Sequence, residues 1–251
     1  MTATVAIPSF YRLFARDEVT STNDEALALA AAGAEEGALV VADRQTRGRG
    51  RRGRSWDSPA GNLHLSLVLT PPAGPSAAGA VGFAGSLAAA DAVARFLPAE
   101  AEVGVKWPND VLVGDRKVGG ILIETVVGRA EALVLGVGVN VARHPAGTTY
   151  PATSLAAEGA ATATAPAVLE AFAESFLERY RGWRRDGMAP LRAAWLARAR
   201  GIGGPIRARL EGATFDGLFR GIDESGALVL DLGDGDVKRI TAGDVFLPGR
   251  A

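Results

Sequence analysis

The chain has 251 residues, of which 48% are hydrophobic and 22% charged, values that are ordinary for a soluble globular protein of one or two domains. It contains no cysteine, which excludes disulfides and thiolate metal sites, and its two histidines, His64 and His144, argue against a histidine-rich metal centre or a Ser-His-Asp hydrolase. The net charge of −1 provides no general basic field that would attract nucleic acid.

The N-terminus and the hydropathy of the chain predict a cytoplasmic protein that does not enter a membrane. The first residues, MTATVAIPSFYRLFARDE, show no basic region followed by an apolar run, so they are not typical of a signal peptide. No uninterrupted stretch of about 20 apolar residues predicts a transmembrane helix.

The first half of the chain predicts two helices and two strands around a loop rich in arginine and glycine. Residues 21–23 (Ser-Thr-Asn) can cap a helix that Gly33 ends, and the short apolar run after it is typical of a buried strand. The predicted elements are a helix over 21–33, strands over 38–42 and 62–70, and a helix over 80–97.

The second half predicts further strands of the same sheet, then two helices, then a small β domain. The glycine-rich segment 201–205 (GIGGP) is the best candidate for a domain boundary, and the short alternating strands after it predict a barrel of about 45 residues. The predicted elements are strands over 103–107, 110–113, 117–126 and 131–141, a connection over 144–165, helices over 167–186 and 190–200, and barrel strands over 206–247.

The arginine-glycine loop, residues 47–54, alternates small and cationic side chains. Glycines let backbone N–H groups approach a ligand, and arginines bind phosphate oxygens with a planar fork. Because like charges repel, we expect the loop to be mobile without a ligand and to close as a lid over an anionic nucleotide. A solvated surface loop and an RGG-like nucleic-acid contact remain open as alternatives. The arginines of this region are Arg44, Arg47, Arg49, Arg51, Arg52 and Arg54.

No familiar phosphate-binding motif accompanies this loop. The pattern G-x-x-x-x-G-K-[ST] does not occur, and residues 136–140 (GVGVN) do not complete a dinucleotide fingerprint because Val141 takes the place of the third glycine. A protein that uses ATP here must therefore bind phosphate by another design.

Four segments, in chain order, resemble the biotin–protein ligase family. Each alone is a weak signal, but the arginine-glycine loop, the K-W-P-N-D box and their spacing to Lys117 are highly specific together. A stretch over 215–228 resembles the family's C-terminal barrel, so the match covers nearly the whole chain. The four segments are Ser21 to Asn23, Gln45 with Gly48 to Trp56, Lys106 to Asp110 with Lys117 to Ile121, and Gly136 to Asn140.

The resemblance implies an α+β fold in which helices flank a mixed β-sheet, as in class II synthetases and the biotin–lipoate ligases, followed by a small SH3-like β-barrel. It divides the chain into a catalytic domain over residues 1–203 and a barrel over 204–251. Because the match begins almost at Met1, we expect a single-function ligase without the N-terminal DNA-binding domain that some family members carry.

The activity implied by the resemblance is that of an ATP-dependent ligase that forms a C–N amide bond. Such an enzyme makes biotinyl-5′-AMP from biotin and ATP, releases pyrophosphate, and transfers biotin to a lysine of a biotin carboxyl carrier domain of acetyl-CoA carboxylase or another biotin-dependent carboxylase. The implied cofactors are ATP and Mg²⁺, with the ion held by the phosphates and water rather than by a protein metal site. We expect a monomer or homodimer with no nucleic-acid partner.

The first chemical step joins two anions, so it requires cations rather than an acid–base pair. The resemblance implies that Lys117 contacts the biotin carboxylate and the α-phosphate, and that Arg49 and Arg51 contact biotin and the adenylate. From its local sequence alone, Lys117 is an ordinary solvent-facing turn lysine. Asp110 is hypothesised to accept a hydrogen bond from the acceptor amine or to orient it, and a structural turn carboxylate is the alternative. The implied catalytic residues are Lys117, Arg49, Arg51 and Asp110.

Biotin needs polar groups around its ureido edge and apolar walls around its chain, and adenine needs an aromatic surface such as Trp56. The polar residues 21–23 fit the first requirement, and they fit a helix cap equally well. The implied biotin-binding residues are Ser21, Thr22, Asn23, Gln45, Gly48, Arg49, Gly50, Arg51, Lys117, Gly119, Gly120 and Ile121. The implied ATP-binding residues are Arg51, Arg54, Trp56, Lys106, Asn109, Lys117 and Asn140.

Two rival functions remain at this stage. A lipoate–protein ligase shares the adenylation chemistry and the general fold, although the complete arginine-glycine loop favours biotin. A nucleic-acid-binding module would show salt-dependent affinity for oligonucleotides and consume no ATP. The sequence also leaves open whether the barrel docks the carrier domain, completes the ATP site or only stabilises the fold.

Overall fold

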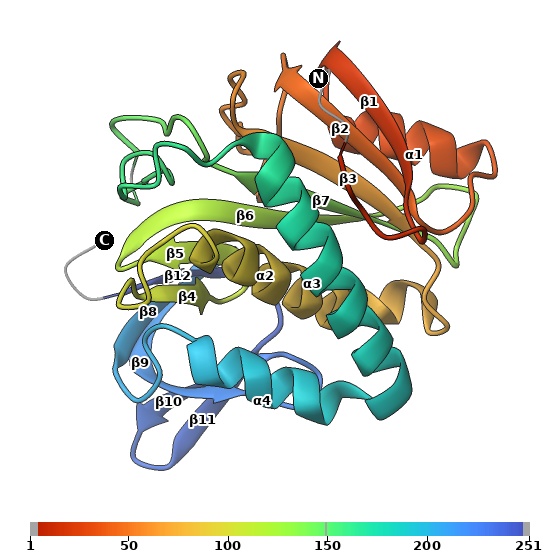
Figure 1. The fold of residues 1–251 in the computed structure, drawn as a ribbon. Coiled ribbons are helices and arrows are strands. Elements are labelled where there is room, and N and C mark those ends of the chain that lie inside the picture. Colours follow the sequence, from red (N-terminus) through yellow and green to blue (C-terminus); the bar gives the residue numbers. More distant parts are fainter. Residues whose placement is uncertain (1–4, 149, 248–251) are drawn as a thin grey trace.

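The computed structural model describes residues 5–148 and 150–247, which form two β-sheets and four α-helices (Figure 1). The larger sheet has seven strands in the order β1-β2-β3-β7-β6-β5-β4, and its β1–β2 pair is parallel whereas the other neighbours are antiparallel. Its strands are β1 (Arg12–Val19), β2 (Ala38–Gln45), β3 (Leu63–Leu69), β4 (Val103–Lys106), β5 (Asp110–Val113), β6 (Arg116–Thr125) and β7 (Leu133–Val139).

Helices cover both faces of this sheet, so the central strands are largely apolar on both faces instead of alternating regularly with polar residues. Side chains of a strand point to opposite faces in turn. Leu39 and Val41 therefore join the core under α2 (Ala78–Ala94) and α3 (Ala165–Asp186), while Val40 packs with α1 (Thr22–Ala31) on the other face.

Helix α2 lies between the sheet and α3 and is made mostly of small residues. A Cβ atom at Gly85 would lie 3.1 Å from the Leu135 side chain, so the glycine permits close approach of helix and sheet. The segment Gly74–Ala94 is long and apolar enough to cross a membrane. However, 72% of its apolar 18-residue stretch is buried within the protein, as in the core helix of a soluble protein.

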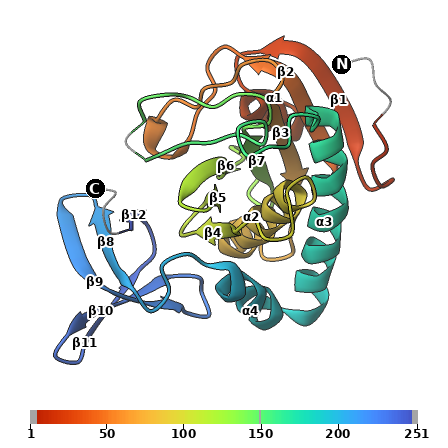
Figure 2. The same ribbon diagram turned by 60° about the vertical axis from the view of Figure 1, so that its left-hand side comes forward.

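The second sheet follows α4 (Met188–Arg198) and lies to one side of the larger sheet, as Figure 2 shows. Its order is β11-β10-β9-β8-β12, and among the described residues the outer strands β11 and β12 do not pair, so no closed barrel is present there. The closed barrel expected from the sequence is therefore not confirmed. The strands are β8 (Pro205–Leu210), β9 (Ala213–Ile222), β10 (Leu228–Gly233), β11 (Asp236–Ile240) and β12 (Asp244–Phe246).

All four predicted α-helices occur, with starts that differ from the prediction by one or two residues, whereas strand β1 was missed. The sequence of β1, RLFARDEV, is mostly polar and partly exposed because the strand lies at the edge of the sheet. An edge strand has one neighbour and little buried surface, so it carries a weak hydrophobic pattern.

Candidate active site

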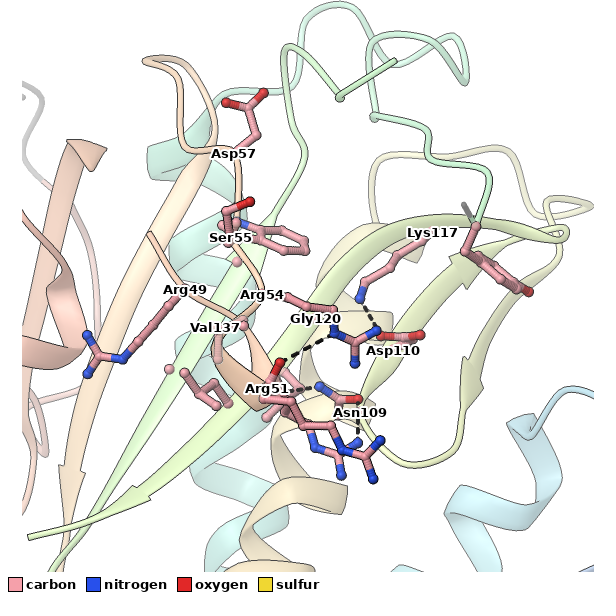
Figure 3. A pocket seen from close by; sticks show the side chains of 18 of the residues that line it. Arg49, Arg51, Arg54, Ser55, Asp57, Asn109, Asp110, Lys117, Gly120 and Val137 are labelled. Atoms are coloured by element: carbon pink, nitrogen blue, oxygen red, sulfur yellow. Dashed lines mark hydrogen bonds and ion pairs between the residues drawn. The ribbon is translucent and has the colours of Figure 1, made fainter. Parts of the chain in front are cut away.

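A cavity of about 550 Å³ lies where the arginine-glycine loop, the larger sheet and the C-terminal sheet meet. Its walls come from the start of α1, the loop around residues 49–57, strands β5, β6 and β7, and strand β12 with its neighbour β8. Figure 3 shows Arg51 of the loop beside Asn109, and Lys117 beside Asp110, around this space. The cavity therefore joins sequence segments that are far apart along the chain.

A lysine–aspartate cluster, consisting of Lys106, Asp110 and Lys117, forms the cationic wall. The carboxylate of Asp110 pairs with Lys106 Nζ at 2.7 Å through one oxygen and with Lys117 Nζ through the other. Burial alone would raise the pKa of the Asp110 carboxyl, but the two ammonium groups outweigh it and hold that pKa well below its usual range. Asp110 is thus ionised at neutral pH and fixes the direction of the Lys117 side chain.

A β-bulge places Lys117 at the cavity. On strand β5, Val111 pairs with Gly119 and Leu112 with Lys117, so Val118 is the extra residue. Bulges of this kind change the direction of a side chain relative to a regular strand. The Lys117 side chain keeps 26% of its surface exposed, whereas the Lys106 side chain keeps 7%, so Lys117 is the more accessible ammonium group of the cluster.

The glycines of β6 and β7 leave room for two side chains that pack on the sheet. A Cβ at Gly138 would lie 2.5–2.9 Å from the indole ring of Trp56, and one at Gly136 would collide with Asn23. The Trp56 ring lies 5.4 Å from Lys117 Nζ, and its buried Nε1 has no hydrogen-bond partner among the described residues. The glycines of the GVGVN segment therefore leave space for the side chains of Asn23 and Trp56 to pack against the sheet.

A polar cluster, consisting of Ser21, Thr22, Asn23, Gln45 and Ser66, lies around the start of α1, and its members other than Ser66 line the cavity. Gln45 Oε1 accepts hydrogen bonds from the backbone N–H (2.7 Å) and hydroxyl (3.1 Å) of Thr22. Ser66 Oγ lies 2.5 Å from Asn23 Oδ1. Ser21 occupies the N-cap position, but its hydroxyl makes no capping hydrogen bond. The helix-cap interpretation of residues 21–23 therefore explains less than the polar cluster does.

The Glu124 carboxylate links this polar cluster to the arginine-glycine loop. It accepts from Asn23 Nδ2 at 2.6 Å and from Arg49 Nη2 at 2.8 Å, and Arg49 also pairs with Asp24 at 2.6 Å. Figure 3 shows the Arg49 side chain extending away from Lys117 and Asp110. Arg49 lines the cavity, but its guanidinium group is engaged by carboxylates in this structure.

The rest of the loop is bound to the C-terminal sheet. Arg54 Nη2 pairs with Asp244 at 2.7 Å and Arg52 Nη1 with the same carboxylate at 3.4 Å, while Arg51 Nη1 donates to the Gly243 carbonyl at 3.2 Å. The loop closes as a single 3₁₀ turn over Arg51–Gly53. The repulsion expected from its like charges is therefore offset by acidic and carbonyl partners, a pairing that the local sequence did not indicate.

Most of the predicted site residues line this one cavity, and Gly48 and Gly119 do not. Gly48 packs under the loop, where a Cβ would lie 2.6 Å from the Trp56 carbonyl oxygen, and Gly119 faces the Gly138 carbonyl oxygen. The predicted residues that line the cavity are Ser21, Thr22, Asn23, Gln45, Arg49, Gly50, Arg51, Arg54, Trp56, Lys106, Asn109, Asp110, Lys117, Gly120, Ile121 and Asn140.

Sequence reasoning missed the wall that the C-terminal sheet provides and some residues nearer the loop. No motif marks the wall from the C-terminal sheet, because its residues contact loop residues more than a hundred positions away in sequence. Ser66 was also missed, since it appeared only as one residue of an apolar strand. The cavity-lining residues without a predicted site role include Ser55, Asp57, Tyr150, Arg209, Asp244 and Phe246.

Comparison with known proteins gives a consistent family assignment. Residues 13–140 match the biotin/lipoate A/B protein ligase family, and residues 201–247 match the biotin protein ligase C-terminal domain. A biotin–[acetyl-CoA-carboxylase] ligase of Paracoccus denitrificans is 42% identical over 91% of this chain and 98% of its own length. A ligase of the same name from Mycobacterium tuberculosis is 38% identical over 90% of this chain and 85% of its own.

Solved structures show the same fold. The biotin protein ligase of Aquifex aeolicus in complex with biotin and ATP has a TM-score of 0.80 and 26% identity, and the match covers 94% of this chain and 98% of that one. The enzyme of Leishmania major in complex with biotinyl-5-AMP has a TM-score of 0.63 and 26% identity, over 92% and 98% of the two chains.

Proposed function

Because this chain belongs to the biotin/lipoate A/B protein ligase family, we propose that its cavity makes biotinyl-5′-AMP from biotin and ATP and transfers the biotin to a lysine of a carboxylase carrier domain. The protein is thus an ATP-dependent ligase that forms an amide bond. The observation that carries this proposal is that one cavity is lined both by residues of the polar cluster, its polar end, and by the lysine–aspartate cluster, its cationic end.

The polar end favours biotin over lipoate. Biotin presents a ureido group with both donors and acceptors, whereas the ring of lipoate is an apolar disulfide. The buried side chains of Ser21, Thr22 and Asn23, with Gln45 and Ser66 beside them, supply hydrogen-bonding groups that a dithiolane ring would leave unsatisfied. Ile121 and the glycines of β6 provide the apolar wall for the valeryl chain.

The cationic end suits the first half-reaction. A carboxylate oxygen of biotin attacks the α-phosphorus of ATP, a new C–O–P linkage forms, and the bond to the β-phosphate breaks so that pyrophosphate leaves. Lys117 lines the cationic end and would neutralise both the carboxylate and the α-phosphate, while Asp110 holds its ammonium in place. Arg51 and Arg54 face the phosphates from the loop, and Arg49 reaches the ligand once it exchanges a carboxylate partner for a substrate anion.

The adenylate is proposed to lie against the loop and strand β7. Trp56 offers its ring and an unsatisfied indole N–H at this wall, with Asn109 and Asn140 at its edges. The Gly50 N–H already donates to the Arg54 carbonyl at 2.7 Å and Gly48 packs under the loop, so we assign both glycines to the shape of the loop beside biotin, and Gly119 shapes the strand that carries Lys117. Lys106 donates to the Val245 carbonyl at 3.0 Å and contributes charge to the phosphate site.

In the second half-reaction the neutral amine of the acceptor lysine attacks the acyl carbon of biotinyl-AMP, an amide bond forms, and AMP leaves. Both oxygens of Asp110 are taken by lysines, so Asp110 can orient the amine only by releasing one of these partners. Its lowered pKa also makes it a weak base. We therefore assign Asp110 to the positioning of Lys117 first and to amine contact second.

Mg²⁺ is proposed to arrive with ATP. Among residues 5–148 and 150–247 no group of three His, Asp or Glu side chains could hold a metal ion, and the nearby carboxylates of Asp110 and Asp244 already pair with cations. Phosphate oxygens and water would therefore be its ligands. We also propose that the protein is a cytoplasmic monomer or homodimer. Its net charge of −1 supports the absence of a nucleic-acid partner.

The domain division over 1–203 and 204–251 is kept as a proposal, with residues 1–4 and 248–251 outside the described structure. The five strands of the C-terminal sheet, and the match to the family's C-terminal domain, support an SH3-like unit. Because this unit lines the cavity, completion of the ATP site is the role we favour for it.

Biotin-dependent ATP–pyrophosphate exchange tests the proposal. The protein is expected to exchange labelled pyrophosphate into ATP with biotin and to show little exchange with lipoate. Exchange with lipoate but not biotin would transfer the assignment to the rival ligase, and exchange with neither acid would refute adenylation altogether.

A further inference from the structure

The C-terminal sheet brings one more cation to the cavity. Arg209 on β8 lies directly opposite Asp244 on β12 in the antiparallel ladder, so both side chains project from the same face of the sheet. Arg209 and Asp244 both line the cavity that holds the lysine–aspartate cluster. Strand β12 is fixed there by the hydrogen bond from Lys106 to the Val245 carbonyl.

Arg209 differs from most other cavity cations in its neutralisation, and Arg51, which also makes no ion pair with a described residue, donates instead to the Gly243 carbonyl and to Asn109 Oδ1. Lys106 and Lys117 share Asp110, Arg52 and Arg54 share Asp244, and Arg49 has Glu124 and Asp24. Arg209 makes no ion pair with any described residue. Its charge therefore remains available to an anion from outside the protein.

An aromatic ring holds this free charge in place. The Arg209 guanidinium lies 4.6 Å from the centroid of the Phe246 ring, a cation–π arrangement that restricts the side chain without using its hydrogen-bond donors. Phe246 also lines the cavity. A planar fork with free donors at the edge of a cationic cavity matches the geometry of phosphate oxygens.

We propose that Arg209 binds the β- and γ-phosphates of ATP and stabilises the pyrophosphate as it leaves. The inference rests on the proposed function, which places the α-phosphate at Lys117 on the larger sheet. The remaining phosphates then extend toward the C-terminal sheet, where Arg51 contacts the Gly243 carbonyl and Arg54 pairs with Asp244. Negative charge grows on the β-phosphate as its bond to the α-phosphate breaks, so a free cation there favours the transition state.

The test compares Arg209→Ala with Arg207→Ala. Arg207 lies two residues earlier on the same face of β8 and is also exposed, but it pairs with Asp216 at 2.8 Å and does not line the cavity. Removing Arg209 is expected to raise the KM for ATP and for pyrophosphate in biotin-dependent exchange about 10-fold, the loss typical of one charge-assisted hydrogen bond. Arg207→Ala is expected to change neither constant more than about 2-fold.

Transfer from preformed biotinyl-AMP provides the second readout. This intermediate lacks β- and γ-phosphates, so Arg209→Ala is expected to bind it and to biotinylate a carrier domain as the unchanged protein does. An unaltered KM for both ATP and pyrophosphate would overturn the inference, as would a higher KM for the carrier domain alone, which would assign Arg209 to carrier docking. If the unchanged protein showed no biotin-dependent exchange, the proposed function itself would fail first.

Discussion

Replacing Asp110 by asparagine removes the one negative charge that separates two buried or half-buried lysines. The substitution keeps the size of the side chain but leaves the ammonium groups of Lys106 and Lys117 without their shared anion. Lys106 cannot escape to water, since its side chain is 7% exposed and is enclosed by Tyr150 and strand β12. An uncompensated buried charge is the expected result.

The burial of the two lysines determines how much unfolding free energy the substitution removes. Breaking a buried ion pair by removing one partner costs about 3–5 kcal/mol, and the half-exposed Lys117 can recover part of its hydration, so we expect about 3 kcal/mol. For a chain of this size that loss corresponds to a fall of roughly 6–12 °C in Tm. Because Lys117 also loses its anchor, biotin-dependent exchange should fall at least ~10-fold.

The pH dependence adds an independent check. The pKa of the Asp110 carboxyl is lower in the folded protein than in the unfolded chain, so its ionised form stabilises the fold. That contribution is complete above the unfolded-state pKa of about 4 and is lost as the pH falls toward the folded-state value. The stability difference between Asp110→Asn and the unchanged protein should therefore be constant from about pH 7 to pH 5 and shrink below about pH 4.

Urea unfolding followed by tryptophan fluorescence measures these quantities, and the exposed Asp236→Asn serves as control. A loss of unfolding free energy below about 1 kcal/mol at pH 7 would show that Asp110 does not stabilise the two lysines as described. A stability difference between the two proteins that grows on acidification would show the same.

Three further substitutions test the cavity. Lys117→Ala should lower the rate of ATP–pyrophosphate exchange by at least ~100-fold while the circular dichroism spectrum stays unchanged, because a charge at the reacting centre is lost. Gly138→Ala should raise the KM for ATP several-fold and change the tryptophan fluorescence, because the new Cβ displaces the Trp56 ring. Glu124→Gln should weaken biotin binding, measured by calorimetry, about 10-fold, because the neutral amide loses the charge that pairs with Arg49 and has one accepting oxygen for the donors that now use both carboxylate oxygens.

Each of these predictions has an outcome that contradicts it. A normal rate of ATP–pyrophosphate exchange by the Lys117 variant would mean that Lys117 has no central role in adenylation. An unchanged KM for ATP in Gly138→Ala would mean that the Trp56 ring does not contact the nucleotide. Equal biotin affinity for Glu124→Gln and the unchanged protein would mean that the polar cluster holds its geometry without this carboxylate.

The central strands, the helices and the cationic loop were predictable because their signals are local. Apolar runs such as 38–42 indicate strands buried on both faces, and the alanine-rich stretch near residue 80 indicates a buried helix. The arginine-glycine loop and Lys117 stood out through composition and spacing, and the cavity unites them.

What the sequence did not reveal depends on contacts between distant segments. Strand β1 lies at an edge and lacks an apolar pattern, and the pairing of Arg54 with Asp244 spans the two sheets. The bulge that directs Lys117 into the cavity is a register shift between β5 and β6, which no local pattern encodes. The predicted barrel is not confirmed for a related reason, since closure depends on pairing between the outermost strands, and β11 and β12 do not pair among the described residues.

The central claim is that one cavity activates biotin and then delivers it to protein. The most direct measurement mixes the chain with ATP, Mg²⁺, biotin and a carrier domain and determines the intact mass of the carrier. The account predicts the addition of one biotin, dependent on ATP and abolished when the acceptor lysine is replaced. An unchanged carrier mass, while the chain binds biotin and ATP, would contradict it.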